Sequence, residues 1–138
     1  IFGKIIHMTP QTIFMLVSIG LFAGLLSGFV GVGGGIIIVP ALVFLLGLTQ
    51  HQAQGTSLFV LMLPVVSFAV LNYWKSGNVK WEYGLVIAMT FIVGAFFGSK
   101  LSLKISPGLV QLLFGILMAY ISFRMILSGY TSISSDES

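Results

Sequence analysis

The sequence has 138 residues, of which 57% are hydrophobic and only 7% are charged, with a mean hydropathy of +1.12. A soluble domain carries about a quarter charged residues, so this chain has too few polar side chains to cover a globule in water. Its six Lys and Arg residues form no basic stripe, which argues against binding of nucleic acid. Cys is absent, which excludes disulfides and thiolate metal sites. The composition predicts an integral membrane protein.

Apolar stretches follow one another at 12–29, 36–47, 55–74, 81–101 and 108–127. A helix needs about 20 residues to cross a hydrocarbon core of about 30 Å, so four stretches predict full spans. The second stretch, 36–47, would reach only about 18 Å and predicts a half-helix or a re-entrant arm. We therefore expect an all-α membrane domain over residues 1–127, a bundle of four transmembrane helices plus one short broken or re-entrant helix. Residues 128–138 are Ser-rich and acidic, which predicts a disordered tail.

Residues at the ends of these stretches favour helix ends. Thr9-Pro10 and Ser106-Pro107 each place an N-cap residue before a proline at the first helical position. Thr49 and Gln52 have the spacing of a capping box. Glycines also stand where helices can end, at Gly47, Gly77 and Gly129.

The basic residues leave two membrane orientations open. If all five stretches cross, or the first two form a re-entrant pair, Lys4, Lys100 and Lys104 share one side and Lys75, Lys80 and Arg124 the other. This even split is compatible with dual insertion. If residues 12–47 cross only once, the split becomes four to two and the turn 75–80 is cytoplasmic.

Two series of glycines recur every four residues along one helix face. Gly20, Gly24 and Gly28 lie in the first span, and Gly94 and Gly98 lie in the fourth. Small residues at this spacing let helix backbones approach closely, so these five glycines predict helix packing and a tightly interlocked bundle.

The segment 31–35, Gly-Val-Gly-Gly-Gly, is a different kind of feature. Glycine disfavours helix by about 1 kcal/mol per residue relative to Ala, so we expect an unwound segment before the short helix. Pro40 fits this interpretation, as it would prevent a regular helix from running through. The N-terminus of the short helix would then offer free N–H groups and a partial positive charge to an anion at Gly33, Gly34 and Gly35. The alternative is a plain interhelical turn at the membrane surface.

Polar residues elsewhere supply few further candidates. Thr56 and Ser57 follow Gly55 and could complete the anion site or simply pack between helices. His51 and Glu82 are possible proton carriers, although both also suit structural roles. No pair of carboxylates, catalytic triad or metal-ligand cluster stands out, so we expect neither an enzyme nor a cofactor or metal.

Several motifs in order resemble the TauE/SafE family, the sulfite exporter-like membrane permeases. They are Gly24-x-x-x-Gly28-x-x-Gly31-x-Gly33-Gly34-Gly35-x-x-x-x-Pro40-x-Leu42, Ala53-x-Gly55-Thr56-Ser57, Gly77-Asn78-Val79-x-Trp81 and Gly94-x-x-x-Gly98. The resemblance covers residues 20–127. Lys80 departs from the family, which more often has an acidic or neutral residue before this Trp; that changes the charge of the loop without touching the predicted site.

The resemblance implies transport of small anions, notably sulfite and organosulfur compounds, across the cytoplasmic membrane. Family members typically carry two related halves, and this chain resembles one. That implies either a homodimer or larger assembly of half-units, or a fragment of a longer chain. The alternatives are a non-transporting subunit of a larger membrane complex, a passive anion channel and a carrier for another solute.

Overall fold

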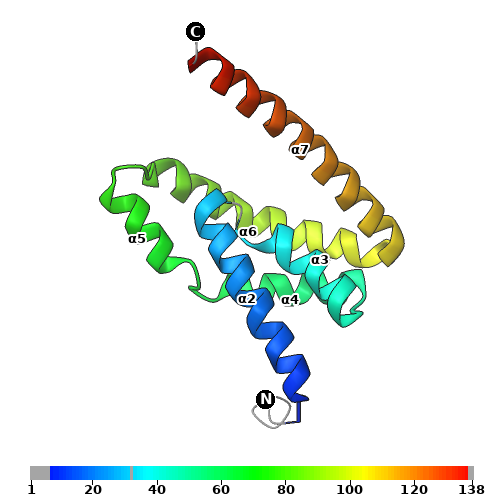
Figure 1. Cartoon of the computed structure of the whole chain (residues 1–138). Helices are drawn as coiled ribbons and strands as arrows, with labels where there is room; N and C mark the ends of the chain where they lie inside the picture. The colour runs from blue at the N-terminus through cyan, green and yellow to red at the C-terminus, as the bar shows by residue number, and fades with distance from the viewer. Residues whose placement is uncertain (1–6, 32, 137–138) are drawn as a thin grey trace.

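The computed structural model describes residues 7–31 and 33–136. Within these ranges the chain forms helices and no strand (Figure 1). In chain order the helices are α2 (Pro10–Val30), α3 (Gly35–Leu46), α4 (Gln50–Met62), α5 (Ser67–Lys75), α6 (Trp81–Lys104) and α7 (Pro107–Asp136).

Helix lengths confirm an all-α membrane protein. By length and composition, α2, α6 and α7 can each cross a membrane, and α4 with α5 can supply a fourth span. The second apolar stretch is short, as predicted, because α3 has only 12 residues. Membrane-spanning α-helices are expected for such a chain, since they satisfy their backbone hydrogen bonds within one segment.

The predicted helix starts are confirmed by their hydrogen bonds. The Thr9 hydroxyl accepts from the N–H of Thr12 at 3.2 Å, and the Ser106 hydroxyl accepts from the N–H of Leu109 at 3.4 Å. Thr49 and Gln52 form both bonds of a capping box. These bonds satisfy N–H groups that a helix start otherwise leaves without partners.

Two predictions about the continuity of helices need correction. Pro40 lies inside α3, which runs through it unbroken, because the fixed φ of proline is compatible with a helix although one backbone hydrogen bond is lost. The predicted span 55–74 is instead broken at Pro64. Leu63 before it is extended, with φ −74° and ψ 149°, as steric contact with a following proline favours. Helices α4 and α5 are consequently bent by 54°.

The C-terminal segment is also different from the prediction. Residues 128–136 continue α7 as helix instead of forming a disordered tail, and Gly129 lies inside that helix. Hydroxyl groups of Thr131, Ser132 and Ser135 donate to carbonyls one turn back at 2.9–3.0 Å, so these polar side chains are satisfied within the helix. Residues 137 and 138 lie outside the described ranges.

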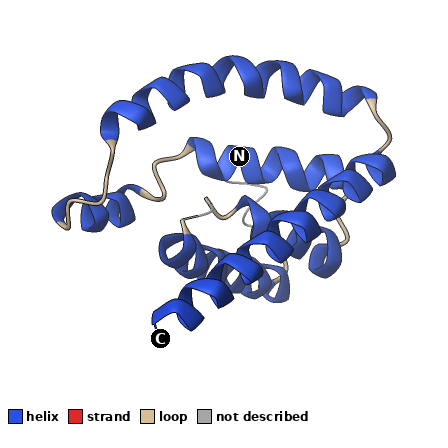
Figure 2. Ribbon diagram, turned by 90° about the horizontal axis from the view of Figure 1, so that it is seen from above, coloured by secondary structure: helices blue, strands red, loops and turns tan. Residues whose placement is uncertain are grey.

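The buried core lies among α2, α3 and α4. It consists of Ile19, Ala23, Ile38, Val39, Leu42 and Ala53. Helix α7 reaches this core near its N-terminus through Phe114, and then extends away from the rest of the chain (Figure 1). Helix α6 has no buried residue and runs along one edge of the molecule (Figure 2).

The predicted packing glycines make few contacts within this chain. A Cβ atom added at Gly20, Gly24, Gly94 or Gly98 would meet nothing within 4 Å, and at Gly28 it would meet only Ala69, at 3.9 Å. The tightly interlocked bundle is therefore not formed inside the chain. A packing role for these glycines stays a prediction that concerns neighbours outside it.

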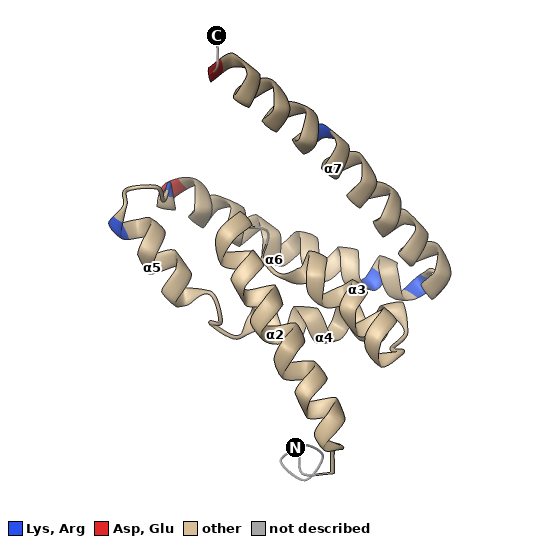
Figure 3. Cartoon of the chain, viewed as in Figure 1, with Lys and Arg blue, Asp and Glu red and all other residues tan. Residues whose placement is uncertain are grey.

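Charged residues of α6 lie near its ends and leave its middle apolar (Figure 3). Glu82 is in the first turn, and Lys100 and Lys104 are in the last two turns. The Lys100 ammonium lies 4.5 Å from the centroid of the Phe96 ring, where the ring face attracts a cation. This distribution is typical of a membrane span with both ends at the lipid–water interface.

Candidate functional site

The glycine segment between α2 and α3 interrupts the helical path at the core of the chain. Gly31, Gly33 and Gly34 have φ values of 79°, 75° and 77°. This left-handed region is open to glycine but strained for other residues, so the sequence requirement at the break is conformational. We call residues 31–35 the glycine break; residue 32 is not among those described.

The amide end of α3 lies at this break without a side-chain cap. Gly34 is the N-cap, and it is buried. Its carbonyl accepts from the N–H groups of Ile37 and Ile38 at 3.0 and 2.9 Å, which begins the helix. Because a helix start carries N–H groups without intrahelical partners and a partial positive charge, this end of α3 favours a negatively charged or electron-rich group.

The carbonyl end of α2 lies at the same break, but two of its acceptors are already used. The Gly31 N–H donates to the Ser27 carbonyl at 2.7 Å, which closes the helix. The Tyr73 hydroxyl of α5 donates to the Gly28 carbonyl at 2.8 Å. The two helix ends are therefore unequal: protein donors neutralise part of the negative end, whereas no side chain among the described residues caps the positive end. This asymmetry favours an anion over a cation.

Two buried serines flank the start of α3. A Cβ on Gly34 would lie 3.8 Å from the Ser27 Cβ of α2, and one on Gly35 would lie 3.5 Å from the Ser57 Oγ of α4. Both serines are less than 10% exposed. Ser27 was not among the residues predicted from the sequence. The one local indication of its role is that its hydroxyl group directly precedes Gly28, one of the predicted packing glycines.

Thr56 does not accompany Ser57 to the break. It is exposed, and its hydroxyl donates to the Gln52 carbonyl of its own helix at 2.7 Å. Successive residues of an α-helix point about 100° apart, so only one of this pair can face α3. Of the predicted residues, the structure brings together Gly33, Gly34, Gly35 and Ser57.

Two adjoining cavities open beside the glycine break. One, of about 290 Å³, lies between α2, the break and the bend after α4, and the other, of about 470 Å³, extends towards α5 and the turn before α6. Ser27, Gly28 and Gly33 line both. Lys80 lines the larger cavity together with Gly31 and Gly33, which corrects the expectation that this residue leaves the site untouched.

The possible proton carriers lie elsewhere. The His51 Nε2 is 3.0 Å from the Ile105 carbonyl, which links α4 to the connection between α6 and α7, and its Nδ1 is buried without a partner in the described chain. Glu82 is exposed in the first turn of α6. Neither residue lines the two cavities at the break. No group of His, Cys, Asp or Glu residues within 7–31 and 33–136 could hold a metal ion.

A helical membrane protein with an interrupted segment, an uncapped helix start and adjoining cavities has the features of a membrane transporter. The comparison with protein families agrees, since residues 12–137 match the family described as sulfite exporter TauE/SafE. The chain belongs to this family. Its curated relatives are named as probable membrane transporter proteins.

Three curated relatives match most of this chain and are each about twice as long. A probable membrane transporter protein of Xylella fastidiosa is 32% identical over 86% of the chain and 46% of its own length. The probable membrane transporter protein YunE of Bacillus subtilis is 35% identical over 83% of the chain and 44% of its own length. A Methanocaldococcus jannaschii relative with a similar name is 27% identical over 88% and 48%. No solved structure matches the chain significantly.

Proposed function

We propose that this chain is one half-unit of a transporter that carries small anions across the cytoplasmic membrane and holds them at the glycine break. The observation that carries the proposal is the inequality of the two helix ends, because Tyr73 and Gly31 satisfy carbonyls of α2 while α3 begins without a side-chain cap. An oxyanion would accept from the backbone N–H groups of Gly33, Gly34 and Gly35.

Side chains around the break supply the remaining contacts. The Ser57 hydroxyl and, in addition, the Ser27 hydroxyl would donate to the bound anion, while Lys80 would attract anions into the larger cavity. Sulfite and organosulfur anions are the proposed substrates, and the description of the family as a sulfite exporter supports the choice of sulfite. In the described spans the positive potential would come mainly from backbone dipoles.

A second half-unit would complete the pathway. The chain spans about half the length of its curated relatives, and α6 has no buried residue. We propose a homodimer in which a two-fold axis brings two glycine breaks together and α6 contacts the partner.

Flux of sulfite, sulfate, methanesulfonate and chloride into vesicles reconstituted with the chain tests this function. We expect saturable sulfite flux, and at least a tenfold loss in Gly34→Val, because a side chain at φ +77° is strained. Gly84→Val is the matched control, since Gly84 lies in α6 with open space around its Cβ position and no left-handed φ. Its flux should stay within twofold of the unchanged chain.

The other outcomes separate the alternatives. Equal flux in Gly34→Val and Gly84→Val would overturn the glycine site. Electrogenic flux that does not saturate would indicate a passive channel, and no flux with every anion would favour a non-transporting subunit. Repeating the assay with and without a proton gradient tests coupling through His51 or Glu82.

A further inference from the structure

The pair formed by α6 and α7 is held against α4 near one end of α6. The His51 Nε2 of α4 lies 3.0 Å from the Ile105 carbonyl, in the connection between α6 and α7. The Ser102 hydroxyl of α6 donates to the Gln54 Oε1 of α4 at 3.3 Å. Val110, close to the start of α7, is the one buried residue of the pair among those described. We call these five residues the α4 joint.

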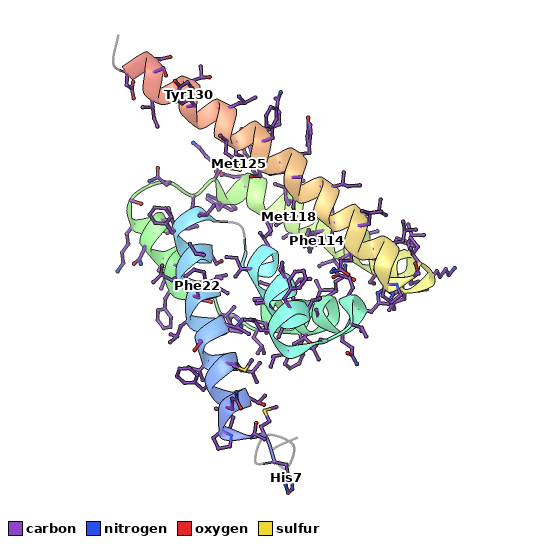
Figure 4. The ribbon with its side chains drawn as sticks, turned by 45° about the vertical axis from the view of Figure 1, so that its right-hand side comes forward. His7, Phe22, Phe114, Met118, Met125 and Tyr130 are labelled. Carbon is purple, nitrogen blue, oxygen red and sulfur yellow. The ribbon has the colours of Figure 1, made fainter. Side chains whose placement is uncertain are left out.

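Beyond the α4 joint the pair is mostly exposed. Helix α6 has no buried residue along its whole length. On α7, Phe114 and Met118 lie on the side towards α3, whereas Met125 and Tyr130 lie along the part that extends away from it (Figure 4). Because buried contacts hold helices in place, an element with few of them can rotate about its point of attachment.

The α4 side of the joint holds two polar atoms whose hydrogen-bonding capacity is unused. A carbonyl only accepts, so in the neutral ring the His51 Nε2 carries the hydrogen and the Nδ1 is an acceptor. This Nδ1 and the Gln50 Nε2 are both buried without a hydrogen-bond partner in the described chain. The two atoms belong to consecutive residues in the first turn of α4. Closure of the joint is therefore opposed by desolvation that no hydrogen bond compensates.

Packing across the joint is also incomplete. A cavity of about 180 Å³ lies between α3, the start of α4 and α7, and its lining includes Gln50, Gln111 and Phe114. Atoms that border a cavity lose dispersion contacts that a closely packed interface provides. The cavity and the two unpaired atoms destabilise the closed joint, whereas its two hydrogen bonds and Val110 stabilise it. This balance favours two arrangements of similar free energy.

We propose that α6 is a lever that rotates about the α4 joint, between the closed arrangement of this structure and an open one. In the open arrangement both hydrogen bonds of the joint are broken, and water reaches the His51 Nδ1 and the Gln50 Nε2. The 24 residues of α6 measure about 36 Å. A rotation of about 10° at the joint would therefore move the far end of α6 by about 6 Å.

The far end of α6 adjoins the site at the glycine break. Val79 and Lys80, directly before the start of α6, line the larger cavity together with Gly31 and Gly33. Rotation of the lever would displace this wall and change access to the break. The rotation itself is independent of the proposed function, whereas its role as a gate rests on that function.

Distances between spin labels test the rotation directly. The chain contains no Cys, so labels can be attached at Leu21→Cys in α2 and at Tyr83→Cys near the far end of α6, both exposed positions. Labelled copies are diluted with unlabelled ones in bilayers, and pulsed electron paramagnetic resonance then measures distances within one chain. We expect two populated distances that differ by about 5 Å or more, as the length of α6 implies. A single narrow distance would overturn the proposal.

Two serine variants locate the point of rotation. Ser102→Ala removes one hydrogen bond of the joint and should shift the populations roughly threefold or more towards the open distance. Ser99→Ala is the matched control, because the Ser99 hydroxyl donates to the Phe96 carbonyl of its own helix. It should leave the populations unchanged. Equal populations in the two variants would overturn the α4 joint as the point of rotation.

A cross-link tests the role of the lever in transport. In Gln54→Cys/Ser102→Cys, a short bis-methanethiosulfonate reagent would hold the joint closed. We expect sulfite flux to fall at least tenfold and to return when a reductant cleaves the cross-link, whereas the two single variants should keep their flux. Full flux in the cross-linked protein would overturn the gate. Absence of flux from every variant, with two label distances present, would overturn the proposed transport but not the rotation.

Discussion

The N-terminal and C-terminal parts of the chain differ in how regular and how buried their helices are. Helices α2, α3 and α4 are interrupted by glycines and contribute all residues of the buried cluster. Helices α6 and α7 are long and unbroken, yet only Val110 in this pair is buried. In this membrane protein, the regular helices are almost entirely exposed within the described chain, and the irregular segment is where packing and buried polar groups meet.

This difference suggests that the two regions have different roles, binding in the first and association in the second. In the interrupted region, Ser27, Ser57 and Gly34 are buried around the start of α3, where the proposed site lies. The regular pair offers a large apolar surface that lipid or a second copy must cover. Substitutions should therefore affect folding and binding in the first region and association in the second.

The largest effect is expected for Leu42→Ala. Leu42 is 3% exposed in the core, so its truncation should lower the free energy of unfolding by about 2–5 kcal/mol. Leu103→Ala is the control, because Leu103 of α6 is 69% exposed and should change it by less than about 0.5 kcal/mol. Denaturant unfolding in mixed micelles measures both values. Similar losses for the two variants would contradict the distinction between the regions.

The next effect is expected at Ser57. Ser57→Ala should weaken sulfite binding roughly tenfold or more, because a hydrogen bond to a charged group contributes about 1.5–3 kcal/mol. Thr56→Val should leave binding unchanged, since the Thr56 hydroxyl is bonded within its own helix. Concentration dependence of sulfite flux gives both affinities. Equal losses would place Thr56 back in the site.

The double variant Gly94→Leu/Gly98→Leu should impair association without affecting the fold. Both positions have open space within the chain, so the cost should fall on a partner helix, with dimerisation at least tenfold weaker, or about 1.4 kcal/mol. Energy transfer between labelled copies in bilayers measures it, and Ser99→Leu, at an exposed position on another side of α6, serves as control. Unchanged association would show that α6 does not use these glycines.

The smallest effect is expected for Tyr73→Phe. Losing the hydroxyl frees the Gly28 carbonyl at the glycine break and removes a bond worth about 0.5–1.5 kcal/mol. We expect sulfite affinity to fall about two- to tenfold, whereas Tyr83→Phe on the exposed surface of α6 should behave as the unchanged chain. An unaltered affinity in Tyr73→Phe would remove the asymmetry of the helix ends as the basis of anion preference.

Features determined by nearby residues could be predicted from the sequence. The length of α3, the caps at Thr9 and Thr49 and the glycine break depend on contacts within a few positions, and the structure contains all of them. Pro64 was a local indication of the bend after α4. The apolar stretch 55–74 is long enough for one span, however, and was therefore predicted to be a single helix. The Ser-rich composition of residues 128–136 predicted disorder. In the structure the segment is helical, because hydroxyl groups such as that of Thr131 donate to backbone carbonyls one turn back.

Features that depend on contacts between helices could not be predicted in this way. Sequence distinguishes neither Ser57 from Thr56 nor the buried Gln50 from the exposed Gln52, because both pairs have similar chemistry. Which member is buried follows from the side of α4 that contacts α3. Likewise, the bond from Tyr73 to the Gly28 carbonyl joins residues 45 positions apart.

The length of α3 also has an electrical consequence. Its 12 residues measure about 18 Å, or somewhat more than half of a hydrocarbon core of about 30 Å. With α3 along the membrane normal and its C-terminus at one membrane surface, an anion held at its N-terminus would cross about half of the transmembrane voltage to reach the site from either side. That corresponds to about 1.2 kcal/mol for each 100 mV, or a roughly sevenfold change in occupancy. A helix too short to span the membrane would thus make anion binding sensitive to membrane potential.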